Sequence, residues 1–133
     1  MPDAVFVSRT VSFGDCDPAG VVFTPRFSYF AIEAIYAALD SWLGAPGLRT
    51  LLSFNVLPPV RAMSVEMLKP LTWDDQLSIK VSVARLGVHS FTFLVEGVHD
   101  EILAFTANVT HVCISPETRE VVVVPEGLRV LLS

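Results

Sequence analysis

Two carboxylates stand two positions apart in a short loop-like segment: Asp15 and Asp17 lie within Phe13 to Val22, which reads Phe-Gly-Asp-Cys-Asp-Pro-Ala-Gly-Val-Val. An ionised carboxylate can attack a carbonyl carbon as a nucleophile or deprotonate a water molecule as a general base. Pro18 fixes its own φ and Gly20 permits backbone conformations closed to other residues, so the segment is expected to form a rigid loop. Aspartates before helices also serve as caps and turn formers, so a structural role for either carboxylate stays open.

The residues after this loop predict one long amphipathic helix from Pro25 to Leu43. Apolar side chains recur at spacings of three and four residues, which places them on one helix face. They are Phe27, Phe30, Ala31, Ala34, Ile35, Ala38, Leu39 and Trp42. Pro25 suits the first turn of a helix, and Gly44 with Pro46 supplies a stop. The loop therefore meets a helix N-terminus, where unpaired amides and the helix dipole favour a negative charge or a developing oxyanion.

Beyond the helix, apolar and polar residues alternate with the period of half-buried strands, most clearly from Leu77 to Val83. Further strands are expected at Val5 to Phe13, Val60 to Leu68, Ser90 to Val98, Ile102 to Ser115 and, as a short one, Val121 to Val124. Leu48 to Pro59 is expected to be a loop with little regular structure. This order predicts an α+β fold with one long central helix against a curved antiparallel sheet of five or six strands. One edge strand of such a sheet is left open to pair across a dimer.

Composition narrows the setting of this fold. The 133 residues fit one domain, residues 1–133, and 52% of them are hydrophobic, so part of the apolar surface is expected at a subunit interface. A net charge of −5 without a Lys/Arg cluster disfavours nucleic-acid binding. No apolar run reaches the roughly 18 residues of a membrane helix, and Met1 to Thr10 lacks the pattern of a secretory signal. No membrane association and a cytoplasmic location are therefore expected.

The cysteines and histidines predict neither a disulfide framework nor a metal site. Cys16 and Cys113 are too few for either, and the acids beside Cys16 oppose formation of its thiolate. His89 near a strand end is expected at the surface, with phosphate binding as the alternative, and His99 beside two acids is expected in solvent. His111 lies on one face of a predicted strand and is expected in a hydrogen-bonded core position. No Gly-x-Ser-x-Gly elbow supports Ser-His-Asp catalysis.

The segment Phe13 to Val22 resembles the active-site segment of the hotdog-fold acyl-coenzyme A thioesterases, and most closely that of the bacterial 4-hydroxybenzoyl-coenzyme A thioesterase family. The similarity continues through Val60 to Pro70, Asp74 to Leu77 and Ala107 to Pro116, and it covers roughly residues 5 to 127. The resemblance implies a hotdog fold and hydrolysis of an acyl-coenzyme A or other acyl thioester. It also implies a homodimer or homotetramer that needs no cofactor.

The same resemblance assigns roles to particular residues. Asp17 is implied as the catalytic carboxylate, acting either as nucleophile or as general base, and these two roles stay open. The backbone amide of Thr24 is implied as the oxyanion donor. Asp15 is expected to order the loop, since its carboxylate can bond turn amides. Phe23 and Phe27, together with residues of a partner subunit, are expected to line an acyl tunnel.

Departures from the family pattern bear on the acyl group. Thr24 stands where relatives carry an aromatic residue or a histidine, which changes the side chain near the reacting carbonyl but keeps the backbone donor. Ser28 and Ile32 replace polar or aromatic residues that shape the aryl pocket of the hydroxybenzoyl enzyme. A phenolic acyl group is therefore not supported.

A second departure affects the binding of nucleotide phosphates. The family's basic run before Ser-Phe is reduced to Arg85 and His89, so either another basic residue such as Arg61 contributes or the carrier differs. This reduction, with Thr24, leaves a second hypothesis open: a non-catalytic hotdog protein that binds an acyl thioester or another apolar ligand. A hydratase or dehydratase on the same fold is a weaker option, because those relatives use a His-centred site that this loop lacks.

Overall fold

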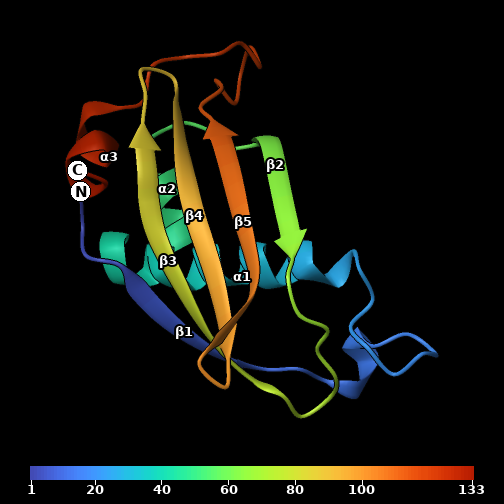
Figure 1. Ribbon diagram of the computed structural model, residues 1–133. Coiled ribbons are helices and arrows are strands. Elements are labelled where there is room, and N and C mark those ends of the chain that lie inside the picture. Colours follow the sequence, from blue (N-terminus) through green and yellow to red (C-terminus); the bar gives the residue numbers. More distant parts are fainter.

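The computed structural model describes all 133 residues, and Figure 1 shows one long helix lying across a five-stranded sheet. The elements are β1 (Val5–Thr10), the one-turn 3₁₀ helix η1 (Phe13–Asp15), α1 (Arg26–Leu43), α2 (Gly47–Leu52), β2 (Val60–Met67), β3 (Gln76–Leu86), β4 (Ser90–His99), β5 (Ile102–Val112) and α3 (Glu126–Leu131). The strand order is β1-β3-β4-β5-β2, and every neighbouring pair is antiparallel. The predicted α+β fold, with a sheet of five strands, is confirmed.

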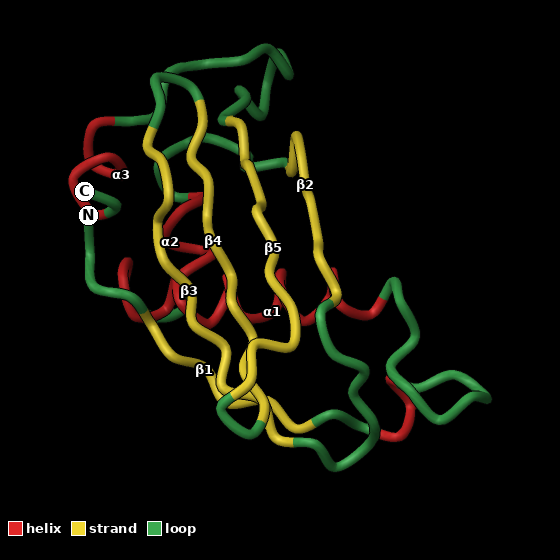
Figure 2. The backbone as a smooth tube through the Cα atoms, viewed as in Figure 1, coloured by secondary structure: helices red, strands yellow, loops and turns green.

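The helix α1 forms where the apolar spacing predicts it and buries that stripe against one face of the sheet (Figures 1 and 2). Pro25 is its N-cap rather than its first residue, and Gly44, at φ +86°, ends it. Gly97 of β4 leaves room for the ring of Phe105 on the neighbouring strand β5. A Cβ on this glycine would lie 2.2 Å from the buried ring of Phe105, so only glycine permits the observed packing. No helix is both long enough and apolar enough to cross a membrane.

Two regions within the chain differ from the sequence-based expectation. The segment Leu48 to Pro59 is not an irregular loop throughout, because α2 occupies its first part. Gly47 starts α2 and permits this arrangement, since a Cβ there would lie 2.3 Å from the backbone of Leu39. Val121 to Val124 forms no strand but only a single bridge between Val121 and Ile114. These differences arise because close backbone approaches and isolated bridges leave no periodic signal in the sequence.

Further differences lie at the ends of elements. The C-terminal helix α3 has no counterpart in the sequence-based expectation; its six residues are too few for a helical period, and Leu128 anchors it in the core. The strand β1 ends at Thr10 instead of Phe13, because η1 turns the chain there. Similarly, β5 ends at Val112, although Ile114 still forms two isolated bridges.

The two edges of the sheet are β1 and β2, each of which pairs with one strand only. The edge strand β2 is exposed at every position except the half-buried Val65. Its methionines Met63 and Met67 are 37% and 47% exposed. An open apolar edge therefore runs beside the start of α1, as the sequence pattern indicates for one edge of the sheet (Figure 1).

Candidate active site

The loop before α1 is a short hairpin with few degrees of freedom. Cys16 and Val22 form an antiparallel bridge at its base. At its tip, the N–H of Asp17 donates to the carbonyl of Val21 at 2.9 Å, and the N–H of Gly20 donates to the carbonyl of Asp17 at 2.9 Å. Gly20 has a φ of +85°, which accounts for the glycine at this position. The loop is therefore ordered by its own backbone.

A second set of contacts fastens this hairpin to the segment between β2 and β3. The N–H of Val22 donates to the carbonyl of Leu71 at 2.8 Å, and the hydroxyl of Thr72 donates to the carbonyl of Gly20 at 2.7 Å. The ring of Trp73 lies against Gly20 and packs edge to face with the ring of Phe13, with centroids 5.4 Å apart. The hairpin thus rests on residues that are distant in the sequence.

Asp15 is buried and bonded on all sides. Its side chain is 1% exposed, and it accepts hydrogen bonds from the N–H of Ser12 at 2.8 Å and from Nη2 of Arg26 at 2.7 Å. Arg9 pairs with its other oxygen at 3.2 Å. Burial opposes ionisation, but the Ser12 amide, Arg26 and Arg9 together outweigh burial and hold the pKa of Asp15 below its ordinary value. Asp15 is therefore a charged structural residue of the loop.

Asp17 has a different environment. Its side chain is partly exposed, and Oδ1 accepts one hydrogen bond from the N–H of Ala19 at 2.9 Å. No other hydrogen bond and no ion pair involves this carboxylate. Between the two aspartates lies Cys16, whose thiol pKa is raised, first by burial and then by the neighbouring acids, so this thiol is a poor nucleophile. Of the two loop carboxylates, Asp17 is the more exposed and the one without a cationic partner.

The backbone N–H of Thr24 has no hydrogen-bond partner within the protein. The carbonyl of this residue accepts from the N–H of Phe27 at the start of α1. An unpaired amide at the beginning of an 18-residue helix adds to the positive end of the helix dipole. A negative oxygen can be stabilised there.

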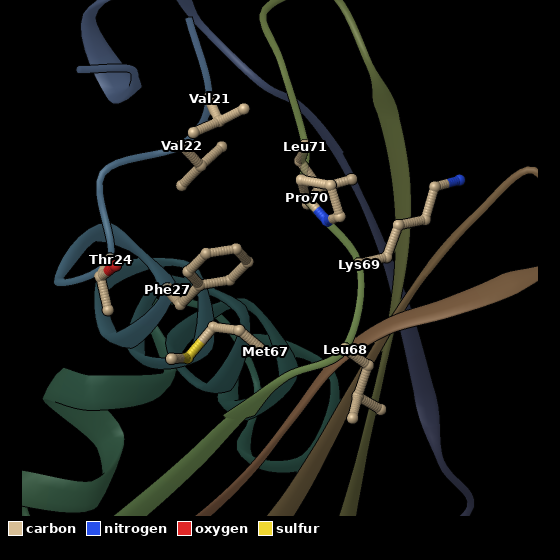
Figure 3. Close-up of a pocket in the computed structure, with 9 residues that line it drawn as sticks. All are labelled: Val21, Val22, Thr24, Phe27, Met67, Leu68, Lys69, Pro70 and Leu71. Atoms are coloured by element: carbon tan, nitrogen blue, oxygen red, sulfur yellow. The ribbon is translucent and has the colours of Figure 1, made fainter. Parts of the chain in front are cut away.

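Next to this amide lies a pocket of about 280 Å³. Its lining comes from the loop, the start of α1 and the end of β2 with the segment that follows (Figure 3): Val21, Val22, Thr24, Phe27, Met67, Leu68, Lys69, Pro70 and Leu71. The amine of Lys69 points away from the pocket and lies 3.4 Å from the carbonyl of His99 (Figure 3). Apart from Thr24, the side chains that line the pocket are therefore apolar or, in Lys69, carry their charge away from it. Phe27 lines this pocket, whereas Phe23 is 51% exposed and does not line it within one chain.

Arg61 and His89, two of the three residues considered for phosphate binding, lie elsewhere. Met67, at the pocket, pairs with Phe105 in the first half of β5, whereas Val60, next to Arg61, pairs with His111 near the end of that strand. His89 lies in the turn before β4, whose first residue pairs near that same far end of β5. Both side chains are exposed. Within one chain, Arg61 and His89 thus lie at the end of the sheet opposite to the pocket.

The other histidines have structural surroundings. His99 is not simply solvated as expected, because Nδ1 bonds the carbonyl of Gln76 at 3.0 Å and Nε2 lies 3.2 Å from Asp100. His111 is buried as expected, and its Nδ1 donates to the carbonyl of Pro58 at 2.8 Å. Its Nε2 has no partner.

Sequence reasoning missed Arg9 and Arg26, which hold Asp15. A signal for Arg26 was present, because it is the first residue of α1, where the helix dipole disfavours a positive charge unless an acid compensates it. Arg9 carried no such signal: it lies on β1, and its contact with Asp15 depends on where η1 turns the chain.

Comparisons with known proteins show the family and the fold. Residues 11–132 match the family model of the Thioesterase-like superfamily. The 1,4-dihydroxy-2-naphthoyl-CoA hydrolase of Synechococcus elongatus is 30% identical over 123 residues, which cover 91% of this chain and 89% of that protein. A crystal structure of a thioesterase-superfamily protein from Jannaschia sp. CCS1 has a TM-score of 0.90 at 32% identity, covering 98% of this chain and 92% of that one.

The resemblance to the hydroxybenzoyl enzymes is found in the fold as well. A structure of a 4-hydroxybenzoyl-CoA thioesterase mutant in complex with 4-hydroxybenzoyl-CoA has a TM-score of 0.84 at 20% identity, covering 98% of this chain and 99% of that one. At this identity the likeness concerns the fold alone. Together with the family match over nearly the whole chain, these findings show that the chain belongs to the Thioesterase-like superfamily and is a thioester hydrolase with the hotdog fold.

Proposed function

We propose that the protein hydrolyses an acyl-coenzyme A thioester, with Asp17 as the catalytic carboxylate and the N–H of Thr24 as the oxyanion donor. One observation carries this proposal: a carboxylate without a cationic partner and a helix N-terminal amide without a hydrogen-bond partner belong to the same ordered loop, beside a pocket lined mostly by apolar side chains. Val21 joins them, because its carbonyl accepts the N–H of Asp17 while its side chain lines the pocket. Coenzyme A as carrier is supported by the name of the Synechococcus elongatus relative.

In this mechanism the thioester carbonyl oxygen points at the N–H of Thr24, and the acyl chain lies in the pocket. The amide and the dipole of α1 stabilise the negative charge that develops on that oxygen. In the nucleophilic route, Asp17 forms a mixed anhydride and coenzyme A leaves as its thiolate; water then hydrolyses the anhydride. In the general-base route, Asp17 takes a proton from the water that attacks the carbonyl. Single-turnover hydrolysis in ¹⁸O water separates the routes, because only the nucleophilic one places ¹⁸O in Asp17.

The pocket supports an acyl group whose buried part is apolar. Apart from Lys69, whose amine points outward, Thr24 is its only lining residue with a polar side chain. A buried phenolic hydroxyl would find few partners there, and an unpaired buried polar group is costly. A panel of aliphatic, aryl and hydroxyaryl acyl-coenzyme A substrates tests this preference; faster turnover of the hydroxyaryl members contradicts it.

The residues proposed to meet the nucleotide, Arg61 and His89, lie at the far end of the sheet from the pocket of their own chain. If they bind the phosphates of coenzyme A, they do so for a ligand seated in another copy. This geometry and the open β2 edge support a homodimer or homotetramer. Residues 1–133 as a single hotdog domain and a cytoplasmic location stay predictions.

A central test is Asp17→Asn. This substitution removes the charge but keeps the side-chain oxygen that accepts the N–H of Ala19, so the loop is expected to stay folded. Hydrolysis of acyl-coenzyme A by the purified variant should fall by a factor of about 10² or more, because either route needs an ionised carboxylate. The matched control is Asp3→Asn, which removes one charge near the N-terminus. Undiminished turnover by Asp17→Asn excludes the proposed role.

The second candidate is a non-catalytic protein that binds an acyl thioester or another apolar ligand. It is favoured by the small number of basic residues available for the nucleotide phosphates. Under this alternative, acyl-coenzyme A binds without release of free coenzyme A, even at high protein concentration. Thiol release monitored across the substrate panel distinguishes the two candidates, because multiple turnovers by wild type are incompatible with a purely binding role.

A further inference from the structure

The carboxylate of Asp15 is held from three separate elements of the fold. The backbone N–H of Ser12 donates to Oδ2 at 2.8 Å from the loop itself. From α1, Arg26 donates to Oδ1 through Nη2 and Nε, at 2.7 and 3.0 Å. From β1, Arg9 donates to Oδ2 at 3.2 Å. The carboxylate is 1% exposed, so it cannot turn toward water without losing charge-assisted hydrogen bonds.

The two guanidinium groups are themselves fixed by further contacts. The guanidinium of Arg26 lies over the ring of Tyr29, 4.8 Å from its centroid. The guanidinium of Arg9 lies over the ring of Phe30, 4.6 Å from its centroid, and also pairs with Glu33. The donors that hold the loop are therefore anchored on the first two turns of α1.

This network is tied to both chemical groups of the proposed site. The backbone carbonyl of Asp15 accepts the N–H of Phe23 at 2.9 Å, and Phe23 directly precedes Thr24. Two residues after Asp15 comes Asp17, whose carboxylate has no cationic partner. Holding Asp15 therefore sets the position of the carboxylate on one side and of the free amide on the other.

Arg26 is the member of the network whose position needs an explanation. It is the first residue of α1, where the helix dipole disfavours a positive charge. The two hydrogen bonds from its guanidinium to Oδ1 of the buried Asp15 compensate this local cost and fix the start of the helix to the loop.

We propose that Arg26 is a positioning residue: through the carboxylate of Asp15 it holds Asp17 and the N–H of Thr24 in the relative geometry that hydrolysis requires. Arg9 supports the same carboxylate through a longer contact and is the weaker partner. This inference rests on the proposed function for its kinetic part, whereas its structural part concerns the order of the loop alone.

The kinetic test compares Arg26→Gln with Arg26→Lys in the full-length protein. Misplacing reacting groups by about 1 Å costs up to about 10²-fold in rate, so Arg26→Gln should lower kcat by about 10- to 100-fold with KM within about twofold. Arg26→Lys keeps the positive charge but loses the planar guanidinium with its two donors, so its kcat should lie between those of Arg26→Gln and wild type. Arg49→Gln on the exposed face of α2 removes the same charge away from the network and should leave kcat unchanged.

The pH dependence of kcat is a second readout. It would not change if Arg26 only stabilised the fold. The groups facing Asp15 are Arg9 on β1, Arg26 with Glu33 on α1, and Asp17 in its own loop. Without Arg26, less positive charge offsets the effect of burial on the pKa of Asp15. The carboxyl of Asp15 should then become protonated at a higher pH. The acidic limb of kcat should move to higher pH in Arg26→Gln and return toward wild type in Arg26→Lys.

Hydrogen exchange of the amides in residues 12–25 tests the positioning without any substrate. Arg26→Gln should speed exchange in this segment but not in β3, β4 or β5. If Arg26→Gln does not fold, Arg26→Lys carries the same comparison. Wild-type kcat or wild-type exchange in a folded Arg26→Gln overturns the inference, as does a loss confined to KM. If the wild-type protein does not hydrolyse the substrates, the proposed function is wrong. Hydrogen exchange in residues 12–25 then still tests whether Arg26 orders the loop.

Discussion

At the scale of single residues, His111 shows how one titratable group is linked to stability. It packs in the core against the rings of Phe91 and Phe93, and only one of its ring nitrogens has a partner. Burial lowers the pKa of His111, although the hydrogen bond to the carbonyl of Pro58 opposes this shift. The neutral ring is therefore the form that the folded protein accepts.

From this shift we predict that the free energy of unfolding falls as the pH drops below about 6.5. In that range the unfolded state binds the histidine proton more readily than the folded state, so stability rises with pH and becomes level above the unfolded pKa. For one proton the slope is at most about 1.4 kcal/mol per pH unit. Urea unfolding between pH 5 and 8 measures it.

The matched variants are His111→Gln and His89→Gln. His111→Gln removes the buried imidazole and should flatten the slope of unfolding free energy against pH. His89→Gln changes an exposed histidine and should leave this slope unchanged. Equal slopes in wild type and His111→Gln refute this account.

At the scale of elements, the fit between α1 and the sheet depends on β4 and β5. Phe105 of β5 lies against Phe27 and Phe30 of α1, with ring centroids 5.4 and 6.3 Å apart. Its ring is completely buried and covers Gly97 on the neighbouring strand. The absence of a side chain at one strand position therefore makes room for the aromatic contact that supports the start of α1.

Gly97→Ala should destabilise the protein by about 1–3 kcal/mol, because the added methyl overlaps a ring that has no free space to enter. Gly14→Ala is the matched control, since no atom lies within 4 Å of the Cβ that it would add. Its effect should stay within about 0.5 kcal/mol. Chemical denaturation of both variants gives the comparison, and similar stabilities would argue against tight packing at this position.

At the scale of the whole molecule, the open β2 edge connects the fold with the site. The exposed methionines Met63 and Met67 lie on this strand, and Met67 also lines the pocket. A second copy that pairs along β2 would cover both side chains and would approach the pocket. Association and the acyl site are therefore expected to be linked.

We predict a concentration-dependent dimer or tetramer that Met63→Lys shifts toward monomer, because it places a charge in a largely apolar contact. Sedimentation at micromolar concentration measures this shift. Val130→Lys on α3 is the control, since Val130 is also an exposed apolar residue but lies on a different element. Wild type that sediments as a monomer rejects the prediction.

The sequence by itself determined the features that local chemistry controls. Apolar spacing places α1 to within one residue, alternation places β2, β3 and β4, and turn-forming residues mark the loop at Asp15 and Asp17. Each of these signals lies within a few neighbouring residues, where helix and strand periods act.

Only the tertiary structure decided which distant residues meet. In the folded chain, Arg9 and Arg26 contact Asp15, and residues 67–71 line the same pocket as Thr24. Arg61 lies at the other end of the sheet. These outcomes depend on strand order and on where β1 and β2 end, which no local pattern encodes. For that reason the loop proposed to carry the chemistry was readable from the sequence, whereas the contacts that hold it were not.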